Sequence, residues 1–250
     1  MLAGVVALAG AASSRGTPDE DRWPVVRTLH FAVHHESPRL PRDFIRRAEA
    51  MHGRLRKELW GLTDWLANER TDVYVYKSRR SFQAGRFDPP EWSAGTFMVR
   101  SGPRGMSRSL GLPEPLDYRT MAHELTHMVL HAYFAVSGEE PPKWFNEGLA
   151  KVMEHEAPLP GDRGPRVSDP VPLREFVRSG PGGHADQAGD WYRQAESLVF
   201  FLKEKGKAGR FTRFVRELRQ GEAVERALMR VYGFRNLSDA EKAWRRWASL

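Results

Sequence analysis

Two histidines and a glutamate stand close together in the segment HELTH, as His123, Glu124 and His127. On a helix, residues four apart lie one above the other on the same face. Both imidazoles could then reach one ion at the ~2.0–2.1 Å that zinc requires, with Glu124 on the adjoining flank beside a water on that ion. The pattern H-E-x-x-H is typical of two histidine ligands with a glutamate base. The alternative interpretation is a helix that carries histidines on a polar face.

A third histidine, His131, follows on the same predicted helix. Along a straight helix it would lie about 12 Å from His123, too far for one ion that His127 also binds. The metzincin pattern H-E-x-x-H-x-x-G-x-x-H fails as well, because Leu130 and Tyr133 stand where glycine and histidine are needed. We therefore expect His131 to be a partly buried helix residue or to line a cleft.

The third ligand should come from another element, and the segment WFNEGLA at residues 144–150 offers Glu147. Pro141-Pro142 should break the chain before this second helix. Because Gly148 has no side chain, we expect the second helix to lie close to the HELTH helix there. The alternative role for Glu147 is favourable placement near the positive end of the helix dipole. In combination with H-E-x-x-H, the pattern favours a metal ligand.

Nineteen residues separate His127 from Glu147, and HELTH followed by WFNEGLA resembles the gluzincin metallopeptidases, the family of thermolysin and aminopeptidase N. The form W-x-N-E-G-x-A is most similar to the aminopeptidase N branch and to small bacterial peptidase MA-like domains. The resemblance implies zinc held by His123, His127 and Glu147, with Glu124 as the general base, in a zincin-like fold. It covers the chain from about residue 27 to the end, most firmly from 117 to 205.

The segment YRQAESLVFFL, residues 192–202, resembles the Y-x-K-G helix of aminopeptidase N relatives. In those relatives the tyrosine hydroxyl donates to the tetrahedral oxyanion, and the resemblance implies this role for Tyr192. Gln194-Ala195 replaces the Lys-Gly pair of the pattern. The alternative is a tyrosine that packs beside Trp191.

Two departures from the family pattern stand near these motifs. The segment SAGTFMVR, residues 93–100, offers no carboxylate where aminopeptidases carry the G-x-M-E-N glutamate that grips the free amine of the substrate. The sequence therefore lacks the residue with which aminopeptidases select the N-terminus of a substrate. Lys151 stands where thermolysin-like enzymes place an acid that orients a histidine ligand, which leaves Glu154 as a candidate for that partner.

The resemblance implies a zinc-dependent peptidase in which Glu124 activates a zinc-bound water and Tyr192 shares the charge of the carbonyl oxygen with the metal. We expect cleavage of internal bonds in a peptide or protein substrate. One alternative is a catalytically silent domain that binds zinc or peptide. Another is a basic protein that binds the cell envelope or polyanions and holds zinc incidentally. Glu124 argues against a silent site, because a site that only ligates gains nothing from a base.

The 250 residues include 40% hydrophobic residues and no cysteine, and their formal net charge is +7. The length is most simply that of one globular domain. Without cysteine, a metal must bind to histidine, aspartate or glutamate. A basic balance can favour nucleic acid, but we find no aromatic RNA-binding signature, C₂H₂ finger or basic heptad helix. We expect no nucleic-acid partner and a monomer.

Small and apolar residues run from Leu2 to Ala12. This run is too short to span a bilayer, which needs about 20 residues. It resembles the apolar part of a secretory signal with an A-x-A site at Ala9-Gly10-Ala11, although no Lys or Arg precedes it. We therefore expect a signal peptide at residues 1–14, a polar linker at 15–24 and export to the periplasm or the exterior. We expect no integral membrane segment in the rest of the chain.

The order of elements predicts an α+β fold, with an N-terminal mixed sheet and a helix followed by a mostly helical C-terminal part. Residues 25–250 should form one metallopeptidase domain, β-rich to about residue 116 and helical from 117. Alternating or β-branched stretches predict strands at 27–33, 72–78 and 92–100. A helix should run from Pro41 to near Gly61.

Asp117 should cap the HELTH helix. Beyond the WFNEGLA helix, residues 157–190 predict a long loop with a short helix at 173–179. Three helices should close the chain: one over 191–202, one from about 210 through 218, and one begun by a capping box of Ser238 and Glu241.

Overall fold

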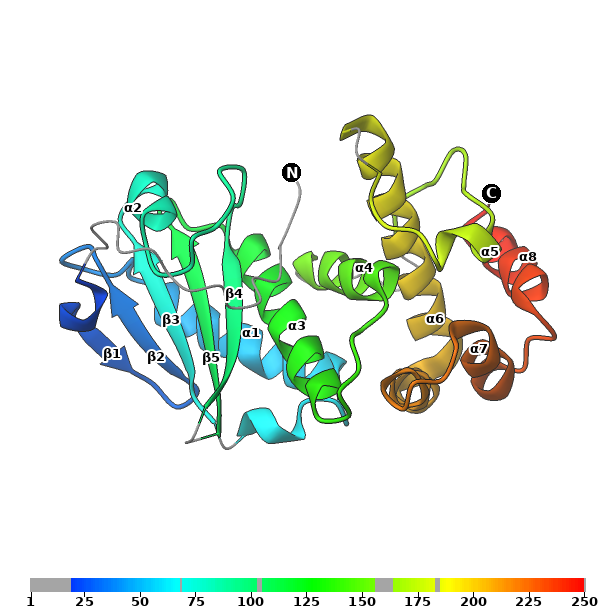
Figure 1. Ribbon diagram of the computed structural model, residues 1–250, viewed down its shortest axis with the longest axis horizontal. Helices are drawn as coiled ribbons and strands as arrows, with labels where there is room; N and C mark the ends of the chain where they lie inside the picture. Colours follow the sequence, from blue (N-terminus) through cyan, green and yellow to red (C-terminus); the bar gives the residue numbers. More distant parts are fainter. Residues whose placement is uncertain (1–18, 68, 103–104, 156–163, 183–184, 250) are drawn as a thin grey trace. The chain divides into compact units, whose positions relative to one another are not determined.

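The computed structural model describes residues 19–67, 69–102, 105–155, 164–182 and 185–249. They form the predicted α+β fold, in which a mixed sheet with helices precedes a mostly helical part (Figure 1). The chain divides into two compact units. The sheet unit is Met1–Lys57 with Thr63–Val129, and the helical unit is Glu58–Leu62 with Leu130–Leu250. The predicted signal peptide, residues 1–14, lies outside the described residues.

The sheet unit contains five strands in the order β1-β2-β3-β5-β4. The strands are β1 (Val25–Arg27), β2 (Phe31–His35), β3 (Thr71–Tyr76), β4 (Thr96–Gly102) and β5 (Gly105–Pro113). The three central strands are parallel to one another, whereas β1 and β4 pair antiparallel at the two edges. The sheet is therefore mixed, as predicted, and β4 forms one of its edges.

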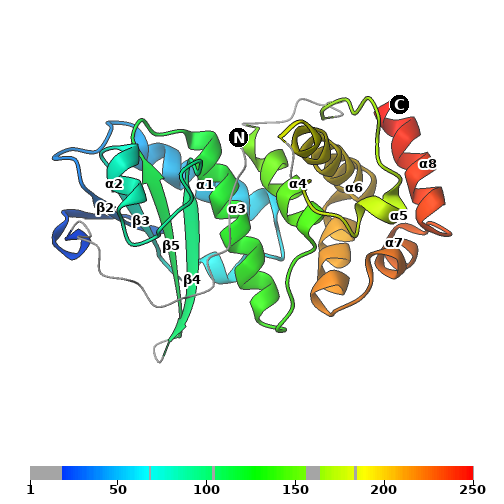
Figure 2. The same ribbon diagram turned by 45° about the horizontal axis from the view of Figure 1, so that its top comes forward.

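The helices of the sheet unit are η1 (Glu20–Arg22), α1 (Phe44–Glu58), η2 (Asp64–Ala67), α2 (Arg79–Gln83) and most of α3 (Tyr118–Ala135). The buried face of α1 includes Phe44, Ala48 and Leu55, which recur at helical spacing. The start of α1 meets the start of α3, where the Tyr118 hydroxyl donates to Asp43 at 3.3 Å. The two helices lie next to each other in both views (Figures 1 and 2).

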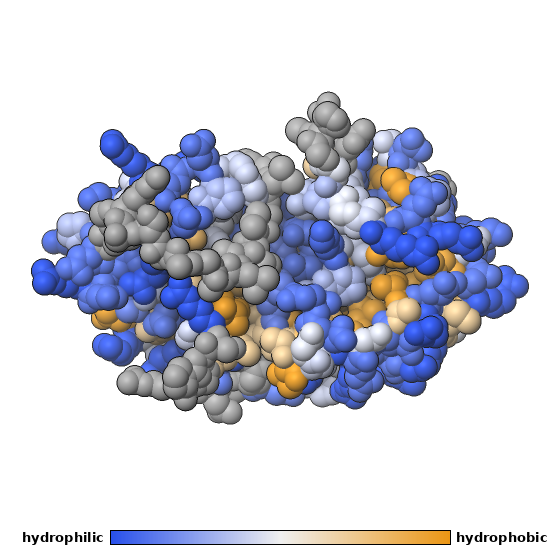
Figure 3. Space-filling view, in the orientation of Figure 1, coloured by the Kyte–Doolittle hydropathy of each residue, from blue (hydrophilic) through white to orange (hydrophobic). Residues whose placement is uncertain are grey.

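The helical unit contains the last turn of α3 together with α4 (Lys143–Glu154), α5 (Leu173–Phe176), α6 (Ala185–Arg219), α7 (Val224–Tyr232) and α8 (Leu237–Ala248). Its core is aromatic, with Trp144, Phe145, Phe214 and Trp244 all fully buried. Hydrophilic residues dominate the face that Figure 3 shows. Among the residues that the structure describes, no helix combines the length and apolar character needed to cross a bilayer.

The predicted strand at residues 27–33 is wrong, because the chain turns within it. Thr28 closes the turn, donating from its backbone nitrogen to the Phe31 carbonyl at 2.9 Å and accepting from Phe31 N at 3.0 Å on its hydroxyl. Leu29 lies at the tip of this turn and is 74% exposed. β1 and β2 are thus the two strands of a hairpin. The alternation of apolar and polar residues continued across the turn, which is why the sequence predicted a single strand.

The third predicted strand begins later than expected, at Thr96, and the strand after it, β5, was not predicted. The β5 sequence GMSRSLGLP has few β-branched or aromatic residues. Its interior side chains Leu110 and Leu112 are buried, and Gly111 lies under Phe87, so a Cβ there would come 2.7 Å from the ring. Side chains from other elements, such as Phe87, therefore bury this strand, which its own small residues do not reveal in the sequence.

The two helices expected around 191–202 and 210–218 fall within one helix, α6. Gly206, between the two expected helices, lies against Tyr232, and a Cβ there would come 2.8 Å from the tyrosine oxygen. That hydroxyl donates to the Leu202 carbonyl at 2.9 Å. Tertiary packing therefore explains the glycine. The helix α7, which carries Tyr232, was not predicted.

The predicted capping box at the last helix is wrong by two residues. α8 begins at Leu237, and the side chain of Asn236 accepts a hydrogen bond from Asp239 N at 2.9 Å. Ser238 already lies inside the first turn. Asn and Ser are both favoured at the N-cap position, so the residue types alone allowed either Asn236 or Ser238 as the N-cap of this helix.

Candidate metal centre

The helix α3 carries HELTH and begins with the predicted cap. Asp117 accepts a hydrogen bond from Arg119 N at 2.9 Å and one from the Thr120 hydroxyl at 3.1 Å. These bonds satisfy donors at a helix start that has no internal partners for them. Every residue from Met121 to Leu130 is buried. The helix therefore presents its histidines inside the protein, where their orientation is fixed by packing.

The imidazoles of His123 and His127 face each other on one side of α3. Their Nε2 atoms are 2.9 Å apart, and the ring planes are nearly perpendicular, at 86°. Both side chains are almost fully buried. The ring of Phe97, on β4, lies 5.9 Å from the His127 ring. The two nitrogens thus point to a common position, as the i, i+4 spacing predicted.

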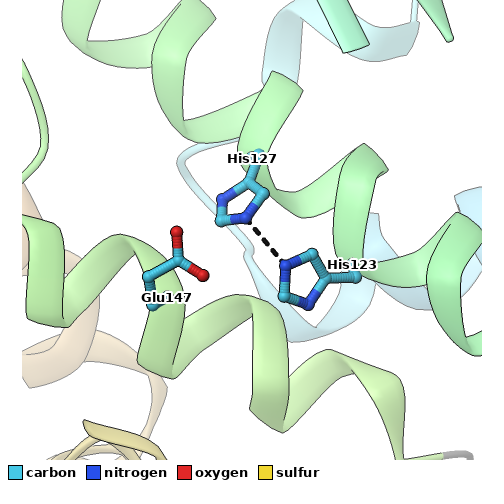
Figure 4. Close-up of side chains that lie close together, drawn as sticks. All are labelled: His123, His127 and Glu147. Atoms are coloured by element: carbon cyan, nitrogen blue, oxygen red, sulfur yellow. Dashed lines mark hydrogen bonds between the residues drawn. The ribbon is translucent and has the colours of Figure 1, made fainter. Parts of the chain in front are cut away.

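Glu147 of α4 lies in the same cluster of potential ligands. One ligand atom from each of His123, His127 and Glu147 falls within 4.8 Å of the others. In Figure 4 the carboxylate of Glu147 points toward the two imidazole rings. The structure therefore brings together the three side chains that the sequence singled out as metal ligands.

This donor set fits a zinc ion. Two neutral imidazole nitrogens and a carboxylate oxygen are among the ligands that zinc prefers. Two nitrogens bound tetrahedrally at ~2.0–2.1 Å from one ion would be about 3.3 Å apart, and the Nε2 atoms of His123 and His127 are within a few tenths of an ångström of that at 2.9 Å. Small rotations of the rings are enough to accommodate an ion.

His131 points to a different partner. Its Nδ1 lies 3.0 Å from a carboxylate oxygen of Glu140, and burial lowers the pKa of the imidazole. The side chain is partly buried, which confirms the expectation for this residue. It forms an ion pair in the helical unit when it is protonated.

Tyr192 lies on α6 near the carboxylate of Glu147. Burial raises the pKa of the Tyr192 phenol, and the negative charge of Glu147 raises it further. Both effects keep the hydroxyl protonated at neutral pH, so it can donate a hydrogen bond. The sequence interpretation of Tyr192 as a donor near the ligand set is compatible with this placement.

A family model described as the Peptidase MA superfamily matches residues 57–249. The chain belongs to the peptidase MA superfamily. No curated protein matches the chain. The match includes α3, α4 and α6, and with them every residue of the candidate centre.

Within this peptidase MA chain, Gly148 has a different role from the one expected. A Cβ on Gly148 would come 2.4 Å from the Ala195 carbonyl oxygen, so the glycine permits close approach of α4 to α6 and not to the HELTH helix. The sequence correctly indicated a close approach but identified the wrong partner. Figure 1 shows α4 and α6 next to each other.

Gln194 explains the departure from the Lys-Gly pattern beside Tyr192. Its buried side-chain amide accepts from Val171 N at 2.9 Å and donates to the Val171 carbonyl at 2.7 Å. The amide thereby holds the segment before α5 against α6. Lys151, at the other departure, pairs with Glu154 at 2.6 Å. The carboxylate of Glu154 is thus engaged by a cation of its own helix.

A buried acid on α6, close in sequence to Tyr192, was not singled out from the sequence. Glu196 is buried on α6, one turn after Tyr192, and its carboxylate oxygen is hydrogen-bonded to Nε2 of His155 at 2.6 Å. Burial raises the pKa of Glu196. The i, i+4 spacing from Tyr192 placed Glu196 on the same helix face, which is the signal that could have identified it.

Proposed function

We propose that this chain is a zinc-dependent peptidase of the gluzincin type that hydrolyses internal peptide bonds. The observation that carries the proposal is the opposed pair of Nε2 atoms, 2.9 Å apart, in the H-E-x-x-H helix of a peptidase MA chain. The inclusion of Glu147 in the same cluster supports a site with three protein ligands. Catalytic zinc sites have this number, which leaves one coordination position for water or substrate.

His123, His127 and Glu147 would hold the ion. When bound, zinc would act as a Lewis acid toward the substrate carbonyl and would make a water acidic near neutral pH. The protein's part is to fix the orientation of both imidazoles, which the buried, tightly packed helix α3 favours.

Glu124 would act as the general base. Its side chain is buried beside His123, where its carboxylate is shielded from bulk solvent. In the proposed reaction it takes a proton from the attacking water and passes that proton to the leaving amine. A buried base keeps the proton within the site, because few water molecules compete for it.

Tyr192 would stabilise the transition state by donating its hydroxyl hydrogen to the carbonyl oxygen as negative charge develops there. The raised pKa of the phenol supports this role, since the hydroxyl stays protonated throughout the neutral range.

The substrate we propose is an extended peptide. Among the residues that the structure describes, β4 is an edge strand whose one partner is β5, so its outer side can accept another strand. No carboxylate is present between residues 93 and 100 to bind a free amine. Selection for internal bonds follows from that absence in the sequence.

The deciding experiment measures zinc content and hydrolysis of a quenched-fluorescent peptide library together. We expect one zinc per chain and cleavage by the wild type. Glu124→Gln should retain zinc and lose turnover, whereas His123→Ala should lose both. Equal activity in wild type and Glu124→Gln would refute the base assignment.

Two other results would favour the alternatives. Stoichiometric zinc without any turnover would indicate a silent domain that binds zinc or peptide. Retention on heparin that survives Glu147→Ala, with no hydrolysis by the wild type, would indicate a basic protein for the cell envelope or for polyanions. Export of the chain, which the N-terminal sequence predicts, is part of the same proposal and is tested by the N-terminus of the secreted protein.

A further inference from the structure

The chain just before β4 lies against the helix that carries the proposed base. Gly95 is buried there, and a Cβ built on it would come 2.7 Å from Thr120 Cγ2, 3.1 Å from Leu112 Cδ2 and 3.2 Å from Glu124 Cγ. Real Cβ atoms essentially never come within 3.0 Å of another heavy atom. Only glycine therefore fits at this position without a displacement.

The contact has a defined register. Gly95 and Phe97 are two residues apart on an extended chain, so they face the same side. The Phe97 ring lies 5.9 Å from the His127 ring, and a Cβ built on Gly95 would lie 3.2 Å from the Cγ methylene of Glu124. Glu124 and His127 are three apart on α3 and lie on neighbouring parts of one helix face. The chain at residues 95–97 therefore packs along both Glu124 and His127.

Hydrogen bonds within the sheet unit fix the position of residues 95–97. The buried hydroxyl of Ser93 donates to the Gly95 carbonyl. β4 then pairs with β5 through its whole length, from Thr96 opposite Gly111 to Gly102 opposite Gly105. A backbone segment that is fixed at both ends can limit the movement of a side chain that packs on it.

We propose that Gly95 is a positioning residue for Glu124. Because Gly95 has no side chain, the chain can lie close to the methylene group of Glu124. This closeness restricts the rotamers of Glu124 and so fixes the direction of its carboxylate. The inference rests on the proposed function for the role of Glu124 as a base. A general base must lie within hydrogen-bond reach of the proton it takes, and a misplacement of about 1 Å can reduce the rate about 100-fold.

The test is made in a Thr120→Ser background. Serine lacks the Cγ2 atom that lies nearest to the added methyl group, but it keeps the hydroxyl that donates to Asp117. Gly95→Ala can then fold while its contact with Glu124 Cγ remains. We expect Thr120→Ser alone to retain zinc and activity within about threefold of the wild type, since Thr120 has no part in the chemistry.

Adding Gly95→Ala to this background should lower kcat by about 10- to 100-fold. KM and zinc content should stay within about twofold, because substrate and metal contacts are not displaced. The matched control is Gly53→Ala, on the exposed side of α1, where no atom lies within 4 Å of an added Cβ. That control should leave kcat unchanged. An unchanged kcat in Gly95→Ala, or loss of zinc together with activity, would overturn the proposal.

A second readout does not depend on activity. The thermal midpoint of the zinc-free protein is measured for Gly95→Ala with and without Glu124→Ala, all in the Thr120→Ser background. Because Glu124→Ala removes Cγ, the destabilisation caused by Gly95→Ala should be smaller in its presence. Equal destabilisation in both backgrounds would show that the added methyl does not press on Glu124, and the proposal would fail.

The two readouts separate the inference from the proposed function. If zinc-loaded wild type hydrolyses no peptide, the proposed function fails, and the stability cycle alone decides whether Gly95 restrains Glu124. If the wild type is active and the cycle is additive, the function stands and the inference fails.

Discussion

Gly148 and Ala195 lie in direct backbone contact, with no room for a side chain on the glycine. A Cβ at residue 148 would be 2.4 Å from the Ala195 carbonyl oxygen and 2.7 Å from its carbon. The contact sets how closely α4 approaches α6. Glu147 directly precedes Gly148, and Tyr192 lies one turn before Ala195. Helix packing at this one point therefore determines the relation between a proposed ligand and a proposed donor.

Replacing Gly148 with alanine should destabilise the helical unit by about 2 kcal/mol or more, because the added methyl overlaps backbone atoms that cannot rotate away. Gly189→Ala, on α6, is the matched control, since no atom lies within 4 Å of a Cβ there. The control should be neutral or gain up to about 1 kcal/mol from helix propensity. Urea unfolding of both variants measures the difference. Equal stabilities would mean that α4 and α6 do not approach this closely.

The partner of Gly148 could not be predicted from the sequence. A glycine inside a helical pattern indicates close approach, but it carries no information about which element approaches. The same limit applies to Gly206, whose missing side chain accommodates Tyr232. By contrast, the HELTH helix was predictable, because its spacing and its cap at Asp117 are local properties of the chain.

The strands show the same division between local and tertiary information. β3 was predicted correctly because its sequence TDVYVY has strong β propensity. β5 was missed because small residues such as Gly111 rely on Phe87 for cover, and that partner is distant in sequence. Of the candidate site, the motif residues were predictable, whereas the role proposed for Gly95 depends on packing that no motif encodes.

Tyr192→Phe should lower kcat by about 100-fold with little change in KM, because it removes one donor to the developing oxyanion. Zinc content should be unchanged, since the hydroxyl is not among the proposed ligands. Steady-state kinetics on a cleaved library peptide, with zinc measured in the same sample, checks both values.

The matched control for that substitution is Tyr232→Phe. Its hydroxyl is also buried and donates to the Leu202 carbonyl at 2.9 Å, within the core of the helical unit. Its loss should cost about 1 kcal/mol of stability and leave kcat unchanged. If Tyr192→Phe behaves like this control, the Tyr192 hydroxyl serves packing only.

Asn236→Ala should destabilise the protein by about 1 kcal/mol, because it removes the side-chain oxygen that accepts from Asp239 N at the start of α8. Ser238→Ala, inside the first turn, should change stability by less than about 0.5 kcal/mol. Thermal unfolding of the two variants compares the observed cap with the one that the sequence predicted. A larger loss from Ser238→Ala would restore the capping box.

His52 should make the sheet unit less stable in acid. The pKa of His52 is lowered from 6.5 to about 4, chiefly by burial and next by the charge of His30, whose ring stacks on it at 3.6 Å. Glu49 opposes this shift, as does a backbone hydrogen bond with Leu66, while Arg56 adds to it.

Between pH 6.5 and about 4 the unfolded chain binds a proton at His52 that the folded chain does not. Stability is therefore fully present above pH 6.5 and falls as the pH drops toward 4, by at most about 3 kcal/mol from this group. His52→Phe keeps a ring against His30 but cannot be protonated, so its urea midpoint should fall less steeply across this range. Unfolding curves at several pH values compare the two slopes. Parallel slopes for the wild type and the variant would mean that His52 takes up its proton equally in both states.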